Sequence, residues 1–420
     1  MIIKPKGTYD IKGENARVLK YIGQVVSDFA EIYNYDFIRT PIFESSELFH
    51  RSVGETSDIV TKETYDFVDR GERNLTLRPE GTASVVRSYI ENKVYGETAV
   101  AKYFYNGTMY RYERPQSGRN REFTQYGIEV LGSNDAHIDA EVISFPLRVL
   151  EALTIDYLTV HINTLGDAES RSNYTIALKD YFRPHLDTLC DDCKKRFETN
   201  PLRILDCKVD RDKEIFVSAP KMSDYLNEES KTRFETVKND LDLLGIDYTV
   251  DDNLVRGLDY YDHTVFEITC DCAELGTGNV LAAGGRYNSL VENLGGPSTP
   301  AMGFASGIER IMVALEAQEV KVVDDKNIDI FVLHVSDKET EKAIYLTQEL
   351  RLNGFKTEMA ACGKALKGQF KDADRSNCKY IIILNEEDFK DHEVQIKDCL
   401  TKETIKEKET NLIDYFDMNF

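Results

Sequence analysis

Charged and amide side chains at strand spacing suggest a site for a polar ligand. Arg111 and Glu113 lie two residues apart, as do Gln125, Gly127 and Glu129. Successive side chains of a strand point to opposite faces, so each set shares one face. A residue without a side chain at Gly127 lets a ligand approach the sheet closely. A solvated face on which Arg111 and Glu113 neutralise each other accounts for this spacing equally well.

These residues belong to an expected antiparallel hairpin. Segments 102–113 and 122–132 alternate and are rich in Tyr, Phe, Ile and Val, and the polar, basic stretch RPQSGRNR separates them. The sequence therefore predicts two long strands joined by a basic loop.

Apolar periodicity predicts the elements that position the hairpin. In chain order, the first expected elements are a helix at 16–33, a strand at 37–44 interrupted by Pro41, a strand end at 76–79 and a helix at 82–93. Charged helices are expected over 167–245. A strand pattern returns at Leu254 and is followed by strands at 264–268 and 280–286 and by a strand joined to a helix at 302–316. A charged linker is expected at 319–326. After it, segments between 328 and 384 alternate as βαβαβ, which predicts a small α/β domain with a largely parallel sheet.

Composition bounds the function. Hydrophobic residues make up 41% and charged residues 30% of 420 residues, which is typical of a folded protein with more than one domain. The sequence has no signal-peptide pattern and no apolar run long enough to span a bilayer, so we expect a cytoplasmic protein with no membrane partner. The net charge of −22 opposes nucleic-acid binding unless basic residues cluster locally.

Several motifs resemble those of histidyl-tRNA synthetases, which are class II aminoacyl-tRNA synthetases. FIRTPIFE resembles motif 1, GTMYRYERPQSGRNREFTQYGIEVLG resembles motif 2, and MGFASGIERIMVAL resembles motif 3. VRGLDYYDHTVFE and GGRYNSL resemble the two signatures that distinguish the histidyl enzymes. The resemblance covers essentially the whole chain.

The resemblance implies an α+β fold in which helices flank an antiparallel sheet, with a helical insertion and a C-terminal α/β anticodon-binding domain. The expected domains are a catalytic core at 1–166 and 251–320, the insertion at 167–250 and the anticodon-binding domain at 327–420. It also implies a homodimer that activates histidine with ATP, accompanied by Mg²⁺, and then transfers it to histidine tRNA.

The resemblance assigns arginines to ATP. Arg111 would bind the α-phosphate, Arg310 the γ-phosphate, and Arg119 the β- and γ-phosphates or the tRNA acceptor end. Glu113 would read the adenine amino group. Arg256 is expected to be unpaired at a strand start. It would act with Arg111 in catalysis by contacting the α-phosphate and the substrate carboxylate. The substitution Arg256→Lys is predicted to raise the adenylation barrier by about 2–4 kcal/mol.

Histidine recognition requires groups that read both imidazole nitrogens. Glu129 would accept a hydrogen bond from one nitrogen, and Tyr261 would bond to the other. The remaining pocket residues that the resemblance implies are Glu80, Thr82 and Gln125 for the α-amino group, with Tyr260 and Tyr287 completing the pocket. Each tyrosine alone is also compatible with a place in the core.

Contacts with tRNA are expected at two places. Gln116 in the basic loop would meet the acceptor stem. Lys364, Lys367 and Lys371 follow helical spacing, which places them on one side of a helix. A charge run of this kind is usually a solvated face, but the resemblance places an anticodon-binding domain here.

Metal binding by the protein itself is not expected. Cys190, Cys193 and Cys207 begin with a CxxC pair, but they lack a well-spaced fourth ligand, and the family does not require zinc. All eight cysteines are expected to be reduced thiols.

Three other functions compete with this interpretation. A regulatory subunit of ATP phosphoribosyltransferase tends to lack the RGLDYY arginine and the anticodon domain. A different class II synthetase would lack the histidyl signatures. A pure tRNA-binding module would have no need for phosphate-binding arginines.

Overall fold

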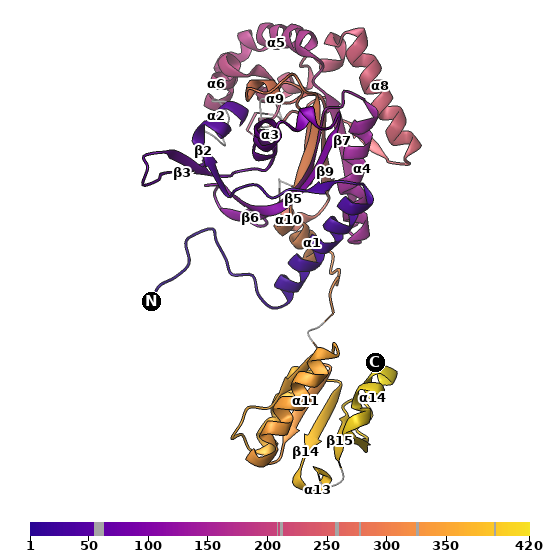
Figure 1. Cartoon of the computed structure of the whole chain (residues 1–420). Coiled ribbons are helices and arrows are strands. Elements are labelled where there is room, and N and C mark those ends of the chain that lie inside the picture. Colours follow the sequence, from indigo (N-terminus) through magenta and orange to yellow (C-terminus); the bar gives the residue numbers. More distant parts are fainter. Residues whose placement is uncertain are drawn as a thin grey trace. The chain divides into compact units, whose positions relative to one another are not determined.

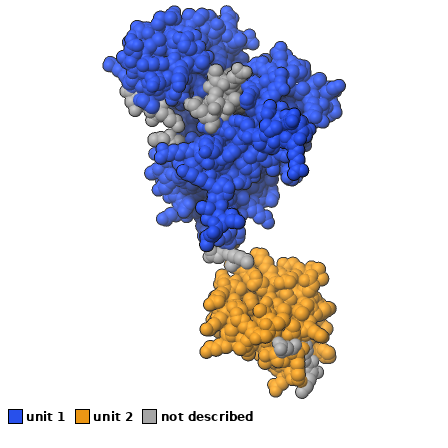
Figure 2. Space-filling model, turned by 90° about the vertical axis from the view of Figure 1, so that its left-hand side faces the viewer, with its two compact units in different colours: residues 1–323 blue, residues 324–420 orange. Residues whose placement is uncertain are grey.

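The computed structural model describes residues 1–53, 63–207, 209–210, 213–256, 260–276, 279–324, 327–389 and 392–420. The chain divides into two compact units, unit 1 at 1–323 and unit 2 at 324–420 (Figures 1 and 2). Residues 257–259 of the RGLDYY signature and 325–326 of the expected linker lie outside the described residues.

Strands of unit 1 come from distant parts of the chain. They are β1 (Asp36–Phe37), β2 (Phe43–Ser45), β3 (Tyr65–Val68), β4 (Asn74–Leu77), β5 (Ala101–Tyr110), β6 (Glu122–Leu131), β7 (Leu158–Thr164), β8 (Tyr248–Val250), β9 (Asp262–Cys270), β10 (Val280–Arg286) and β11 (Ala301–Gly307). Its helices are α1 (Glu14–Ile32), α2 (Ser46–Val53), α3 (Thr82–Glu91), α4 (His137–Ala152), α5 (Ala168–Phe182), α6 (Asp191–Thr199), α7 (Glu214–Val217), α8 (Glu228–Leu243), α9 (Leu290–Asn293) and α10 (Ile308–Ala317).

An eight-stranded sheet forms the centre of unit 1, in the order β1-β5-β6-β11-β10-β9-β7-β8. The edge pairs β1/β5 and β7/β8 are parallel, and the pairs between them are antiparallel. A smaller antiparallel sheet has the order β2-β4-β3. Helices flank the central sheet, so the expected α+β class is confirmed (Figure 1).

Two apolar cores cover the two faces of the central sheet. In the first core, α1 buries Ile22, Val26 and Ala30, which recur every four residues, against α4 and α10. In the second, α3 and the helices of 168–226 pack together. The sheet is therefore held between helices, and ligands can reach it only where small residues or gaps between helices leave space.

Pro41 interrupts the expected strand at 37–44 so completely that its two halves join different sheets. β1 pairs with β5, and β2 pairs with β4. Arg78, which lies between β4 and α3, connects this interrupted segment to β5. Its Nε donates to Thr108 O (2.9 Å), and its Nη1 donates to Thr40 O (3.1 Å) and Thr40 Oγ1 (3.0 Å). This buried guanidinium joins the motif 1 segment to the hairpin.

Two sequence predictions about strands are wrong. β5 ends at Tyr110, so Arg111 and Glu113 follow the strand and do not share a face of it. The strand pattern expected from Leu254 is absent from the described residues there, and the strand begins at Asp262.

Unit 2 is a five-stranded sheet with helices. Its elements are β12 (Ile330–His334), α11 (Thr340–Leu352), β13 (Thr357–Met359), α12 (Leu366–Ser376), β14 (Tyr380–Leu384), α13 (Glu386–Phe389), β15 (Glu393–Asp398), β16 (Thr404–Lys408) and α14 (Leu412–Asn419). The order is β13-β12-β14-β15-β16; β12 pairs in parallel with β13 and β14, and the last two strands add antiparallel pairs. The βαβαβ prediction matches the parallel part, and the antiparallel hairpin was not expected.

Candidate active site

Small residues line up across the centre of the sheet. The registers place Gly127 opposite Ala305, Ala305 opposite Ala283, and Ala283 opposite Glu267 on four adjacent strands. The two alanines of this row, Ala283 and Ala305, leave room above the strands, and the Glu267 carboxylate stands at the end of the row. This row forms the floor of the candidate site.

A cavity of about 240 Å³ opens above part of this floor. The predicted ATP residues Arg111, Glu113, Arg119, Arg256 and Arg310 all line it. Ala282, Ala283 and Ala305 contribute its apolar wall, and Gln125 lies on its edge. The four guanidinium groups come from the hairpin, from the segment before β9 and from α10. We call the cavity that they line the arginine cavity.

The basic loop of the hairpin brings two of these arginines together. Gln116 and Arg119 exchange backbone hydrogen bonds (3.1 and 2.9 Å) around Gly118, whose φ of 65° suits a residue without a side chain. Glu113 lies between the guanidinium groups, with its oxygens 3.8 Å from Arg111 Nη1 and 3.5 Å from Arg119 Nη1. Arg111 is also fixed by donation from its Nε to a backbone oxygen at 2.8 Å.

Arg256 is paired, contrary to the sequence prediction. Its Nη1 donates to Glu267 Oε1 of β9, and its guanidinium lies 6.0 Å from the ring centroid of Tyr261. The Nε of Arg256 is buried and has no hydrogen-bond partner among the described residues. Glu267 therefore orients Arg256 while leaving part of the guanidinium for a ligand.

Arg310 has the least satisfied guanidinium in the arginine cavity. It lies on the first turn of α10, where the helix dipole favours an anion. Its Nε and Nη2 are buried without a partner in the described structure. Burial, and next the nearby Arg119, lowers the pKa of Arg310 to about 10. A buried cation with unused donors beside a second cation is suited to a polyanion.

The predicted histidine residues form a second, closed cluster beside the arginine cavity. Thr82 Oγ1 donates to Glu129 Oε1 (2.6 Å), and Tyr287 OH donates to Glu129 Oε2. The ring centroids of Tyr260 and Tyr261 lie 4.7 Å apart with their planes tilted by 50°, and the ring of Tyr260 meets that of Tyr287 edge-on at 5.6 Å. We call these residues the carboxylate–tyrosine cluster.

Glu129 is fully buried in this cluster, and burial raises its pKa to about 8, while the hydrogen bonds from Thr82 and Tyr287 act in the opposite direction. Its carboxylate lies over Gly303 of β11, where a Cβ would meet Oε2 at 1.8 Å. A buried carboxylate with a raised pKa is a strong acceptor for a ligand that brings its own N–H donor.

Glu80 and Gln125 have different surroundings. Both oxygens of Glu80 accept backbone N–H groups at the start of α3, from Thr82 (2.6 Å) and Ala83 (2.9 Å). Burial raises the pKa of Glu80, and these hydrogen bonds oppose the rise. Gln125 Oε1 is buried without a partner among the described residues, so it is the freer group for an incoming donor.

The interpretation of Gly127 needs correction. A Cβ on Gly127 would meet the Phe304 backbone oxygen at 2.3 Å and the Tyr105 hydroxyl at 2.5 Å. The space above this residue is thus filled by protein, and glycine is required there for packing. The open part of the floor lies at Ala283 and Ala305 instead.

Sequence reasoning missed two ionic groups that position the site. Glu267 is a charged residue between the apolar Phe266 and Ile268 of β9, and that contrast was the available signal. Arg286 of the GGRY signature lies fully buried with Asp139 of α4; its Nε donates to Asp139 Oδ1 at 2.6 Å. Because an unpaired buried charge is costly, this ion pair fixes the chain immediately before Tyr287.

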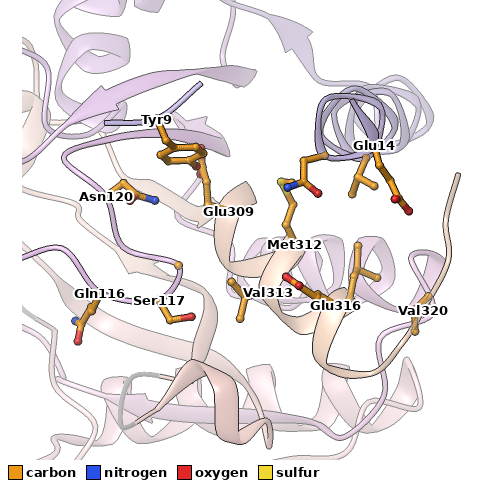
Figure 3. Close-up of a pocket in the computed structure, with 14 residues that line it drawn as sticks. Tyr9, Glu14, Gln116, Ser117, Asn120, Glu309, Met312, Val313, Glu316 and Val320 are labelled. Atoms are coloured by element: carbon orange, nitrogen blue, oxygen red, sulfur yellow. The ribbon is translucent and has the colours of Figure 1, made fainter. Parts of the chain in front are cut away.

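Gln116 faces a different hollow, of about 510 Å³, next to the arginine cavity (Figure 3). Figure 3 shows Tyr9 close to Glu309, with Gln116 and Ser117 on the opposite side. Both oxygens of Glu309 accept the backbone N–H of Thr124, at 2.8 and 2.9 Å. The predicted acceptor-stem residue thus lines this hollow and does not line the arginine cavity.

The basic residues of unit 2 are only partly arranged as expected. Lys364 precedes α12, and its Nζ donates to Asp372 Oδ2 at 2.5 Å, so it lies off the helix and its charge is offset. Lys367 and Lys371 are exposed on α12. The predicted row of three lysines on one helix is therefore wrong for Lys364.

Comparisons with known proteins match this geometry along the whole chain. A family model described as histidyl-tRNA synthetase matches residues 7–311, and one described as an anticodon binding domain matches residues 329–418. The histidine–tRNA ligase of Staphylococcus haemolyticus is 46% identical over 418 residues, covering 99% of each chain, and that of Anoxybacillus flavithermus is 48% identical over 400 residues, covering 95% of each. The crystal structure of apo histidyl-tRNA synthetase from S. aureus has a TM-score of 0.85 at 40% identity, covering 99% of this chain and 100% of that one.

None of the helices in the described segments combines the length and apolarity that a bilayer crossing requires.

Proposed function

The chain belongs to the histidyl-tRNA synthetase family, and we propose that the arginine cavity and the carboxylate–tyrosine cluster together form its active site. The protein activates L-histidine with ATP to histidyl-adenylate and transfers histidine to the 3′ end of histidine tRNA. The observation that carries the site assignment is the convergence of Arg111, Arg256 and Arg310 on one cavity beside a buried, polar cluster.

Adenylation is an attack by the histidine carboxylate on the α-phosphorus of ATP, which forms a C–O–P linkage and releases pyrophosphate. Charge accumulates on the non-bridging oxygens, so fixed donors accelerate the step. Arg111 and Arg256 are proposed to hold the α-phosphate and the attacking carboxylate. Arg310 and Arg119 are proposed to hold the γ-phosphate side, and Glu113 to accept from the adenine amino group.

Specificity for histidine is assigned to the carboxylate–tyrosine cluster. Glu129 accepts from one imidazole nitrogen, and Tyr261 bonds to the other. Gln125, Glu80 and Thr82 surround the α-amino group. A buried carboxylate that lacks its ligand donor costs free energy, so an amino acid without a correctly placed N–H is rejected. Tyr260 and Tyr287 keep water out and hold Glu129.

Mg²⁺ is proposed to arrive with ATP and to bind mainly through phosphate oxygens and water. The carboxylates of Glu113, Glu267 and Glu309 each already face a donor. This donor set therefore does not form a preformed protein cage, which agrees with the usual Mg²⁺ preference for substrate phosphates. The metal ion neutralises phosphate charge when it is bound.

Transfer RNA is proposed to contact both units. Gln116 would approach the acceptor stem from the hairpin loop, and exposed Lys367 and Lys371, with Lys364 as a weaker contributor, would contact the anticodon arm. A local basic group on an acidic protein suffices for such contacts, because most of the surface repels other nucleic acids.

We infer a homodimer formed through the motif 1 region and a location in the cytoplasm, where tRNA is charged. Apolar side chains of this region are exposed: Phe37 (63%), Phe43 (52%) and Val68 (62%). Exposed large apolar groups that gather on one region mark a protein interface. Sedimentation of the purified protein measures this association directly.

The test of the proposed function is histidine-dependent pyrophosphate exchange by the purified protein, with the other amino acids as controls. Exchange with histidine alone is expected. In Glu129→Ala we expect histidine binding to weaken much more than ATP binding, because this carboxylate reads only the imidazole. Equal losses of both affinities would remove Glu129 from the histidine site.

A further inference from the structure

Four metal-ligating side chains meet in the helical segment between β7 and β8, away from the active site. The donor atoms of Cys190, Cys193, Cys207 and Asp210 all lie within 4.8 Å of one another. The expectation that the three thiols lack a fourth ligand is therefore wrong. The Asp210 carboxylate lies where a fourth ligand would lie, three residues after Cys207.

The spacing of these residues follows a recurring zinc pattern. Cys190 and Cys193 are separated by two residues, and so are Cys207 and Asp210, which gives two short ligand pairs with thirteen residues between them. Zinc ribbons use this arrangement of two pairs, and aspartate oxygen is an accepted zinc ligand. Asp210 takes the position of the fourth cysteine.

Local structure brings the two pairs face to face. Cys190 precedes the first residue of α6, and Cys193 lies on the first turn of that helix. A short 3-10 helix, Pro201–Ile204, turns the chain back before Cys207. Cys193, Cys207 and Asp210 are almost fully buried at 0%, 3% and 1% exposure. The burial of two thiols and a carboxylate in one place, with the partly exposed Cys190 beside them, needs a compensating interaction.

Distances distinguish a metal site from a disulfide. The sulfurs of Cys190 and Cys207 are 3.7 Å apart. A tetrahedral zinc ion with Zn–S bonds of about 2.3 Å places two sulfur ligands about 3.8 Å apart, whereas a disulfide requires about 2.05 Å. All eight cysteines are free in the structure. The cluster thus already has nearly the size of a four-ligand zinc site.

Surrounding hydrogen bonds hold the donors in place. The N–H of Asp210 donates to Cys207 Sγ (3.3 Å), and the N–H of Cys190 donates to Asp210 Oδ2 (2.7 Å). Lys213 Nζ lies 2.7 Å from Asp210 Oδ1 and offsets part of the negative charge. A carboxylate has about four lone-pair positions, so these two contacts leave room for a metal bond. Such outer contacts orient ligands in metal sites.

From this geometry we propose that Cys190, Cys193, Cys207 and Asp210 bind one structural zinc ion with tetrahedral coordination. All four positions are taken by the protein, so the ion has no open position for a substrate. Close to Cys207, Leu205 and Asp206 line a separate hollow of about 370 Å³ together with Leu254, Val255 and Glu267, the partner of Arg256. The zinc ion would hold this wall against the segment that carries Arg256.

The test begins with the metal content of the whole protein, purified without chelators and measured by mass spectrometry. About one equivalent of zinc per chain is expected. Cys193→Ser and Asp210→Asn should lower the zinc content, whereas Cys362→Ser, which removes an exposed thiol outside the cluster, should leave it unchanged. Asp210→Cys, which completes the second cysteine pair, should retain zinc and resist chelators for longer.

A second measurement does not depend on the folding of the variants. Cobalt added to metal-free wild-type protein should produce the visible absorption of a tetrahedral, thiolate-bound ion, and a chelator should lower the melting temperature of the wild type and of Cys362→Ser alike. Metal-free wild-type protein that binds neither zinc nor cobalt would overturn the proposal. A resting Cys190–Cys207 disulfide, or full zinc content in both Cys193→Ser and Asp210→Asn, would overturn it as well.

Discussion

Replacement of Arg310 by methionine should make the ligand-free protein more stable while it abolishes most of the activity. Arg310 is half-buried, its Nε and Nη2 are buried without a partner among the described residues, and Arg119 is nearby. The folded protein therefore holds this positive charge at a cost that ATP is expected to remove. Methionine keeps most of the side-chain volume without the charge.

The pKa of Arg310 gives the size of this cost. Its value of about 10, against 12.5 for an ordinary arginine, means that folding disfavours the charged form. Each pKa unit corresponds to about 1.4 kcal/mol, so the charged guanidinium costs about 3 kcal/mol at neutral pH. The group is charged in both states below pH 10, so the cost is fully present at pH 7 and fades only above pH 10.

The assay is thermal melting of both proteins at pH 7 with and without Mg-ATP. Ligand-free Arg310→Met should melt at a higher temperature than the wild type, and Mg-ATP should stabilise only the wild type. Pyrophosphate exchange should fall by about 10²- to 10³-fold, as for the loss of a preorganised donor. Arg111→Met is the matched control: Arg111 has a backbone partner and a nearby carboxylate, so its loss should lower the melting temperature. A lower melting temperature in both variants would refute this reasoning.

Three further outcomes are expected. Arg256→Lys should raise the barrier to pyrophosphate exchange by about 2–4 kcal/mol, because lysine cannot contact Glu267 and a phosphate together. An unchanged exchange rate would contradict the proposed role of Arg256 in adenylation. Histidine should bind more tightly as pH rises toward 8, because the Glu129 carboxylate must be ionised to accept a hydrogen bond from the imidazole and its pKa is raised to about 8. Calorimetry across this pH range should show that the dependence vanishes in Glu129→Gln. Gln116→Ala should keep pyrophosphate exchange and lose tRNA charging, since it faces a different hollow from the arginines, and normal charging would remove it from the tRNA contact.

Local patterns in the sequence predicted the elements well where one face of an element is buried. The hairpin of β5 and β6 differs from its expected bounds by a few residues, because alternation and a polar loop both mark its ends. The helix α1 was equally clear from its apolar spacing. The antiparallel strands β15 and β16 were not expected, since β16 is exposed and carries mostly polar residues.

The candidate site shows where pattern reasoning stops. Individual arginines could be chosen by resemblance, but Arg256 meets its partner Glu267 only because the segment before β9 folds back beside that strand, which spacing alone does not fix. The same limit applies to Gly127, whose neighbour Tyr105 comes from the adjacent strand. Asp210 was overlooked because a carboxylate becomes a metal ligand only when folding brings it to the thiols.

Arg78 connects two segments of the protein that are far apart in the sequence. It ties the segment around Thr40, which carries the proposed subunit contact, to the strand that leads into Arg111, and it lies two residues before Glu80. If the proposed subunit contact forms there, the Arg78 guanidinium transmits any displacement of the Thr40 segment to the walls of both proposed pockets.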